Sequence, residues 1–357
     1  MAFPKESNWG NLPNGNFSAE IYSKMVQVAF RKSTVVGDIT NSNYFGEIAS
    51  QGDSVRIMKE PEVGVFAIKR GSQIVAQDLD DEDFSLTIDK ANGFAFKMDD
   101  IEKAHSHVDF MSLATNRAAY RLSDQHDQEV LGYLAGYKQS EPGINADTVN
   151  DVTNGTKAVD TAGSDELLSS MKLIKGSFSS ITTASAGDHS IPVGIRLPGA
   201  TTVPTAYATP TQIVNRMGRL LDQQLVDRSG RWLVIDPVMM EILCDEDSRF
   251  LHADWGQSGG LRNGLAIENW NGFKVYVSNN LPSVGMGADT AGTTNQNSNY
   301  GVIVAGHDSA VATAEQINKT EKYRDPDSFA DVVRGMHLYG RKILRPEGLV
   351  TAKWNVA

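Results

Sequence analysis

The chain has 357 residues, of which 40% are hydrophobic, enough to bury a sizeable core in about two domain-sized units. Its 33 basic and 44 acidic residues give a net charge of -11, which argues against a protein that binds nucleic acid through a broad basic surface. The single cysteine, Cys244, excludes an internal disulfide, and no window approaches the roughly 18 apolar residues that cross a bilayer.

The N-terminal residues 1–20 are rich in Asn, Gly, Pro and Ser, and they predict an extended arm. Trp9 and Phe17 are isolated aromatic residues in this arm and have little of their own chain to pack on. The arm lacks the apolar core of a signal peptide, so we expect a soluble protein that is made without export. A short helix is predicted next, in residues 19–34.

From Gly52 the hydrophobic periodicity changes to two, which is typical of strands. It predicts strands in residues 54–60, 84–90 and 93–98. The sequence Ala91-Asn92-Gly93 predicts a turn before the last of them.

Between the first two of these strands lies a long excursion, residues 63–83, with Lys69 and Arg70 near its middle. This pattern predicts a protruding hairpin. A two-stranded ribbon is only marginally stable alone in water, so we expect the hairpin to lie on a neighbouring subunit.

A long helix is predicted after the strands. Asp99 or Asp100 can cap it, and its apolar content continues to about Tyr137. As one helix it would exceed 25 residues and run about 40 Å, at about 1.5 Å per residue. Gln125 and His126 interrupt its apolar stripe, whose first members are Met111, Ala114, Ala118 and Leu122.

Residues 140–209 shift to Thr, Ser, Ala, Gly and Asp, and predict a loop-rich part with a possible insertion. One segment in it, residues 165–175, fits a helix through Leu167, Leu168, Met171 and Ile174.

A second helix is predicted with Thr209 as its cap, Pro210 in its first turn and Gly230 at its end. Its apolar stripe is Ile213, Met217, Leu220, Leu221 and Leu225. The segments that follow predict a buried strand at 232–235, a short helix opened by Asp236-Pro237, and further strands at 273–277 and 301–306. This second region is therefore mixed α/β.

The sequence GQSGG matches the G-x-S-x-G pattern of a nucleophile elbow, with Ser258 as the serine. An elbow needs an apolar strand before the serine and a helix after it. The preceding sequence DEDSRFLHADW is not an apolar strand, and the glycines that follow are poor helix formers. His307 and His337 do follow Ser258 in triad order, so a serine hydrolase remains an alternative. Our interpretation is a flexible loop, with Gly256, Gly259, Gly260 and Gly264 as its glycines.

Other chemical motifs are weaker. His105 and His107 lack a third metal ligand at a recognisable spacing, and no GK[ST] sequence is present for nucleotide phosphates. We therefore expect no catalytic residues, no metal and no cofactor, and a structural role for the chain.

Two blocks of the sequence resemble the major capsid proteins of tailed double-stranded DNA bacteriophages, which share the HK-ninety-seven-like capsid fold. They are RWLVIDPVMMEILCDEDSRFLHADWGQSGGLRNGLAIENWNGFKVYVSNNLP at 231–282 and FADVVRGMHLYGRKILRPEGLVTAKW at 329–354. The resemblance implies an α+β fold with five parts. They are an N-terminal arm at 1–52, an E-loop with adjoining P-domain strands at 53–98, a spine helix of the P-domain at 99–139, a mixed α/β A-domain at 140–322 with the possible insertion at 140–209, and a C-terminal return to the P-domain at 323–357.

The resemblance also implies a function. Such proteins assemble into hexamers and pentamers of an icosahedral shell that encloses double-stranded DNA without sequence-specific binding. It implies scaffolding, portal and decoration proteins as further partners, a virion location, assembly in the host bacterial cytoplasm, and no enzymatic or membrane role. Within it we expect Trp9, Phe17, Lys69 and Arg70 to contact neighbouring subunits, and the glycine loop to lie in the A-domain. An encapsulin-like nanocompartment shell has the same fold and is the nearest alternative.

Overall fold

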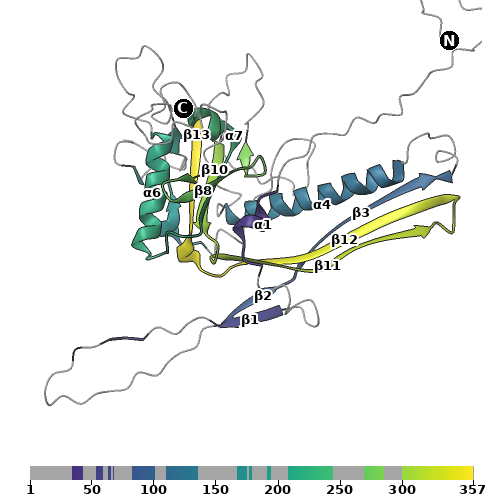
Figure 1. Cartoon of the computed structure of the whole chain (residues 1–357), viewed down its shortest axis with the longest axis horizontal. Coiled ribbons are helices and arrows are strands. Elements are labelled where there is room, and N and C mark those ends of the chain that lie inside the picture. The colour runs from purple at the N-terminus through teal and green to yellow at the C-terminus, as the bar shows by residue number, and fades with distance from the viewer. Residues whose placement is uncertain are drawn as a thin grey trace, which may run out of the picture.

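The computed structural model describes residues 34–42, 54–58, 63–65, 67, 83–100, 110–135, 167–174, 177–178, 191–193, 208–243, 269–284 and 300–356. These residues form two main sheets (Figure 1). An eight-stranded sheet lies in a compact body, and a long three-stranded sheet extends from it with the helix α4 alongside.

The eight-stranded sheet has the order β4-β13-β10-β6-β8-β7, with β5 paired to β13 and β9 paired to β10. β6 and β8 are parallel, whereas β10 is antiparallel to both β6 and β13. The strands are β4 (Lys172–Leu173), β5 (Ile191–Val193), β6 (Arg231–Ile235), β7 (Asn269–Trp270), β8 (Phe273–Val277), β9 (Ser283–Val284), β10 (Tyr300–His307) and β13 (Leu349–Val356).

Both faces of this sheet are buried. In β6, Leu233 and Ile235 belong to a core that includes the helices α6 (Pro210–Gln223) and α7 (Pro237–Leu243). Trp232 and Val234, which alternate with them, belong to a second core that includes the end of α4. Burial on both faces explains why the central strands read as continuous apolar runs, as predicted for 232–235 and 301–306.

The three-stranded sheet is antiparallel in the order β11-β12-β3. Its strands are β3 (Lys90–Asp99), β11 (Val311–Arg324) and β12 (Ala330–Ile343). Alternate residues of β3 are half-buried, including Phe94, Phe96 and Met98, as the period of two predicts. The helix α4 (Phe110–Leu134) runs along this sheet, and its last turn is fully buried (Figure 1). The predicted long helix is thus confirmed over these residues.

A two-stranded ribbon, β1 (Ser54–Met58) with β2 (Asp83–Thr87), packs against the base of the long sheet. Leu86 is fully buried there with Ala312, Ala314 and Leu344. The remaining short elements are α1 (Val36–Ile39), η1 (Ser169–Met171) and η7 (Pro346–Gly348).

Two predicted elements are wrong, and a third, described below, ends early. Residues 91–93 are not a turn, because Ala91, Asn92 and Gly93 lie inside β3 and pair with β12. The helix expected at 165–175 is instead η1 followed by β4, because Lys172 and Leu173 pair in parallel with β13. In this arrangement the side chains of Leu167, Met171 and Leu173 are all buried. Pairing with β13 at the sheet edge therefore overrides the helical spacing of the sequence.

The second predicted helix begins as expected and ends early. Thr209 and Gln212 form a reciprocal capping box at its start. The helix ends at Gln223 rather than at Gly230, and Leu225 is 92% exposed instead of continuing the apolar stripe. Gly230 takes a positive φ of 75° just before β6. The helix predicted at 19–34 lies almost wholly outside the described residues.

Candidate functional site

The residues predicted to contact neighbours or to form a loop lie outside the described part of the chain. They are Trp9, Phe17, Lys69, Arg70, Gly256, Ser258, Gly259, Gly260 and Gly264. Their roles stay predictions. Of the two histidines that follow Ser258, His337 lies in a buried cluster 3.3 Å from Glu315, and His307 contacts Ser309 at 2.9 Å.

The described residues contain no group of three or more His, Cys, Asp or Glu side chains placed to hold a metal ion. In the same residues, no helix is long and apolar enough to span a membrane. Two features remain as candidates. The first is a set of buried polar contacts around Asp127, called the polar junction below, and the second is a set of exposed apolar side chains.

Asp127 is the centre of the polar junction. Its side chain is fully buried, and its Oδ1 accepts hydrogen bonds from the backbone N–H groups of Val35 and Val36 at 2.8 and 3.0 Å. Its Oδ2 accepts from Asn280 Nδ2 at 2.8 Å, and the same amide donates to Asp124 at 2.9 Å. Burial raises the pKa of Asp127, while these hydrogen bonds oppose the rise. One carboxylate thus joins α4, α1 and the loop after β8.

The segment after α1 continues this junction onto the long sheet. Asn41 N–H donates to the carbonyl of Val311 at 2.8 Å, and Thr313 N–H donates to the carbonyl of Asn41 at 3.2 Å. The hydroxyls of Thr40 and Thr313 lie 2.9 Å apart. Residues 34–42 therefore link the helix α4 to the base of β11.

A second polar cluster lies between α4 and the face of the long sheet. The ring of His126 packs edge-on against those of Tyr339 and His337, at centroid distances of 4.6 and 5.3 Å. Tyr339 donates a hydrogen bond to Glu129, and His337 Nε2 lies 3.3 Å from Glu315. This cluster explains why Gln125 and His126 interrupt the apolar stripe: Gln125 donates to Glu129 at 2.8 Å, and His126 packs against the polar residues of β12.

The His126 site predicts a pH dependence of stability. Burial, together with the neighbouring His337, lowers the pKa of His126 to about 4, and its Nε2 has no hydrogen-bond partner among the described residues. Glu315 acts in the opposite direction, and Arg341 adds to the lowering. Because the unfolded chain binds this proton with a pKa near 6.5, stability is fully present above pH 6.5 and is lost as pH falls toward 4. We expect a loss of about 3 kcal/mol across this window.

This expectation is checked by chemical denaturation at pH 7, 6, 5 and 4.5 of the native chain and a His126→Phe variant, which keeps an aromatic ring in the site. The variant should lose less stability than the native chain as pH falls. Equal losses in the two proteins would show that His126 is not responsible.

Large apolar side chains are exposed at three extremities. Met58 and Val65, on the ribbon and just beyond it, are 82% and 97% exposed. Phe329 is 80% exposed at the turn between β11 and β12, and Leu225 is 92% exposed after α6. Single exposed apolar side chains are common on protein surfaces, whereas a contiguous apolar patch marks a surface that contacts another chain.

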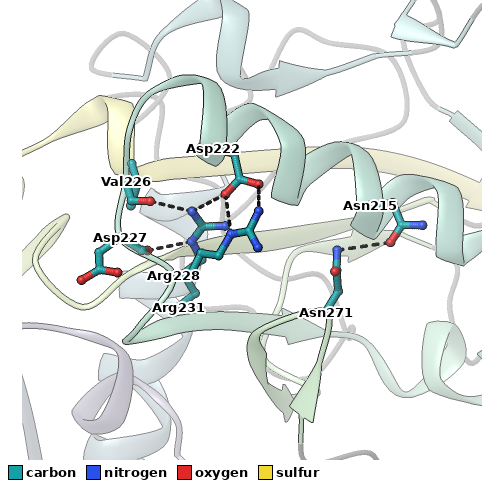
Figure 2. A network of polar contacts seen from close by, with 7 residues as sticks. All are labelled: Asn215, Asp222, Val226, Asp227, Arg228, Arg231 and Asn271. Atoms are coloured by element: carbon teal, nitrogen blue, oxygen red, sulfur yellow. Dashed lines mark hydrogen bonds and ion pairs between the residues drawn. The ribbon is translucent and has the colours of Figure 1, made fainter. Parts of the chain in front are cut away.

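The loop between α6 and β6 is held by a buried arginine (Figure 2). The Arg231 guanidinium donates to the carbonyls of Val226 and Asp227 at 2.6 and 2.8 Å, and to Asp222 Oδ1 at 2.7 Å. Arg228, which is exposed, donates to Asp222 Oδ2 at 2.8 Å. These two arginines lower the pKa of Asp222. Sequence reasoning missed this loop, because it placed residues 224–229 within the helix.

Comparison with known proteins supplies the fold. No protein-family model matches this sequence, and neither does any curated protein. A solved structure from Mycobacterium phage Che8 is 23% identical and covers 94% of this chain and 97% of that chain, with a TM-score of 0.65. The capsid structure of the cyanophage P-SCSP1u is 17% identical, covers 96% and 94% of the two chains, and has a TM-score of 0.60. The capsid of Ralstonia phage GP4 is 12% identical, covers 97% of each chain, and has a TM-score of 0.61.

The chain has the tailed-phage major capsid fold. The α+β class implied by the sequence resemblance is confirmed. In this capsid fold, α4 and the sheet of β3, β11 and β12 form the elongated part, and the eight-stranded sheet forms the compact body. The boundaries expected between arm, E-loop, P-domain and A-domain stay a prediction. Strand β12 lies in the long sheet and β13 in the eight-stranded sheet, so the C-terminal block contributes to both.

Proposed function

We propose that this chain is a structural subunit that assembles into the hexamers and pentamers of an icosahedral shell around double-stranded DNA. The observation that carries the proposal is the match of the whole chain, over 94% or more of its length, to phage structures that include two described as capsids. The match includes the elongated part as well as the compact body.

The shape and surface of the chain support this role. Its long sheet, its ribbon and the end of α6 each carry exposed apolar residues that are uncovered in a single copy. Contacts made head to tail between identical copies close into rings, and many modest contacts per subunit sum to a strong assembly. Trp9, Phe17, Lys69 and Arg70 remain expected contact residues of the arm and the hairpin.

The proposal extends to location and partners. It places the chain in the virion, after assembly in the host bacterial cytoplasm, with a scaffolding protein, a portal protein and a decoration protein as further partners. The net charge of -11 is consistent with a shell wall that encloses DNA without binding its phosphates tightly. No catalytic role is proposed for the chain.

Electron microscopy of the full chain, expressed alone and with a scaffolding partner, tests the proposal. We expect ring-like or icosahedral particles in at least one of the two preparations. A compact monomer in both would overturn the proposal.

The contents of the particles separate the two kinds of shell. Phage-like particles should hold nuclease-protected DNA when they are produced with their packaging partners. Particles that instead enclose a cargo enzyme would favour the encapsulin-like alternative, which shares the fold. The similar structures named above come from phages, and this favours the phage-like shell.

A further inference from the structure

Leu225 occupies a position that usually requires glycine. The helix α6 ends with Gln224 as its cap, and the two residues that follow close back onto the last turn. Leu225 N–H donates to the carbonyl of Asp222 at 3.2 Å, and Val226 N–H donates to the carbonyl of Leu221 at 3.1 Å. This pair of bonds is a Schellman motif, in which the first residue after the cap adopts a left-handed conformation. Leu225 accordingly has a φ of 60°.

This conformation is unfavourable for leucine, because its Cβ crowds the backbone in the left-handed region. Among the described residues, the other non-glycine residue with positive φ is Asn271, and asparagine tolerates that region far better than leucine does. The motif also directs the two side chains apart: Val226 packs against the core that contains Leu221, while Leu225 is 92% exposed. Leu225 therefore combines backbone strain with an uncovered apolar side chain, and a glycine would remove both.

The surrounding loop is held firmly in place, so the position of Leu225 is well defined. The buried Arg231 binds the carbonyls of Val226 and Asp227, which directly follow Leu225, and also binds Asp222, three residues before it (Figure 2). Asp308 N–H donates to the carbonyl of Gly230 at 3.2 Å, which fixes the far end of the loop to the connection between β10 and β11. Strained residues persist only where the surrounding structure fixes them, and such residues cluster at functional sites.

We propose that Leu225 is an assembly contact, whose side chain inserts into an apolar surface of a neighbouring copy of this chain. The inference rests on the proposed function and adds the contact residue to it. A second copy is the partner that fits, because each copy exposes other large apolar side chains, among them Met58, Val65 and Phe329. Asp222 and Arg228, which form an ion pair, each lie three residues from Leu225 in the sequence and would supply polar groups to the rim that commonly surrounds an apolar contact.

A Leu225→Gly variant tests this inference, because glycine relieves the strain and removes the side chain. The free subunit should become more stable, with its unfolding midpoint raised by roughly 1–2 °C. The subunit concentration needed to form particles should rise about fivefold or more. A Leu225→Met variant is the matched control, since it keeps an apolar side chain and the same strained backbone, and it should assemble like the native chain.

The result that overturns the inference is a native chain that forms particles and a Leu225→Gly variant that forms them at the same concentration. Failure of the proposed function would look different, since the native chain itself would then form no particles. A second readout is independent of particle yield. A Leu225→Cys variant in a Cys244→Ser background should react with a maleimide at least about tenfold more slowly in particles than in free subunits. Equal rates in the two states would also overturn the inference.

Discussion

An Asp127→Ala variant should unfold with a free energy about 3–5 kcal/mol lower than that of the native chain, because three buried hydrogen bonds lose their acceptor. The backbone N–H groups of Val35 and Val36 would be buried without the acceptor that they now share, and the side-chain amide of Asn280 would lose its bond to Asp127. Each buried donor left unsatisfied costs about 1–3 kcal/mol. Chemical denaturation of the free subunit measures the loss.

The loss should also be local. Hydrogen exchange of the peptide that contains residues 34–42 should become fast in the variant, because this segment depends on Asp127 for its attachment to α4. Asp38→Ala is the matched control, since Asp38 is exposed in the same segment, and it should change neither readout. Unchanged exchange at residues 34–42 in Asp127→Ala would show that the carboxylate does not hold the segment.

A Gly340→Ala variant should lose about 3 kcal/mol of stability and loosen the ribbon of β1 and β2. A Cβ at residue 340 would lie 2.2 Å from the carbonyl oxygen of Thr87 and 3.1 Å from Cα of Ile88. Both neighbours are backbone atoms, so no side chain can turn aside, and β12 or the ribbon has to move. Overpacking of this kind costs about 1–3 kcal/mol and sometimes more.

The measurement is again denaturation, with limited proteolysis near β1 and β2 to detect the loosened ribbon. Gly37→Ala offers the comparison, because nothing lies within 4 Å of a Cβ at that position in α1. Alanine there should be neutral or slightly stabilising. If Gly340→Ala were as stable and as resistant to protease as Gly37→Ala, the close approach of Thr87 would have no energetic consequence.

The parts of the fold that sequence predicts well are those whose burial follows a simple period. The strand 232–235 is buried on both faces and reads as an unbroken apolar run, and α6 carries a complete capping box at Thr209. The small and apolar residues of the long helix predict it, although its apolar stripe is interrupted. The interruption at His126 marks the polar cluster that α4 shares with β12, which a local pattern cannot reveal because His337 and Tyr339 are over 200 residues away.

The errors have the same origin. Asn92 and Gly93 have the composition of a turn, yet they lie in β3 because β12 supplies a pairing partner from the other end of the chain. Gly93 is suited to that place, since a Cβ at residue 93 would lie only 3.1 Å from the carbonyl oxygen of Gly335. The helical spacing predicts Leu225 as a stripe residue, whereas Arg231 fixes the loop in a different path. The polar junction at Asp127 depends on segments more than 90 residues apart, so it was found only in the structure.

The hairpin of β11 and β12 enters and leaves the eight-stranded sheet through two of its central strands. β10 leads into β11, β12 leads into β13, and β10 and β13 are paired neighbours. Its two strands have 14 residues each, so at about 3.3 Å per residue this hairpin is about 45 Å long. A rotation of about 5° at its base, where Asn41 is bonded to Val311 and Thr313, would move the far end by about 4 Å. Small adjustments among the buried hydrogen bonds of this junction would therefore produce large changes in the reach of the hairpin.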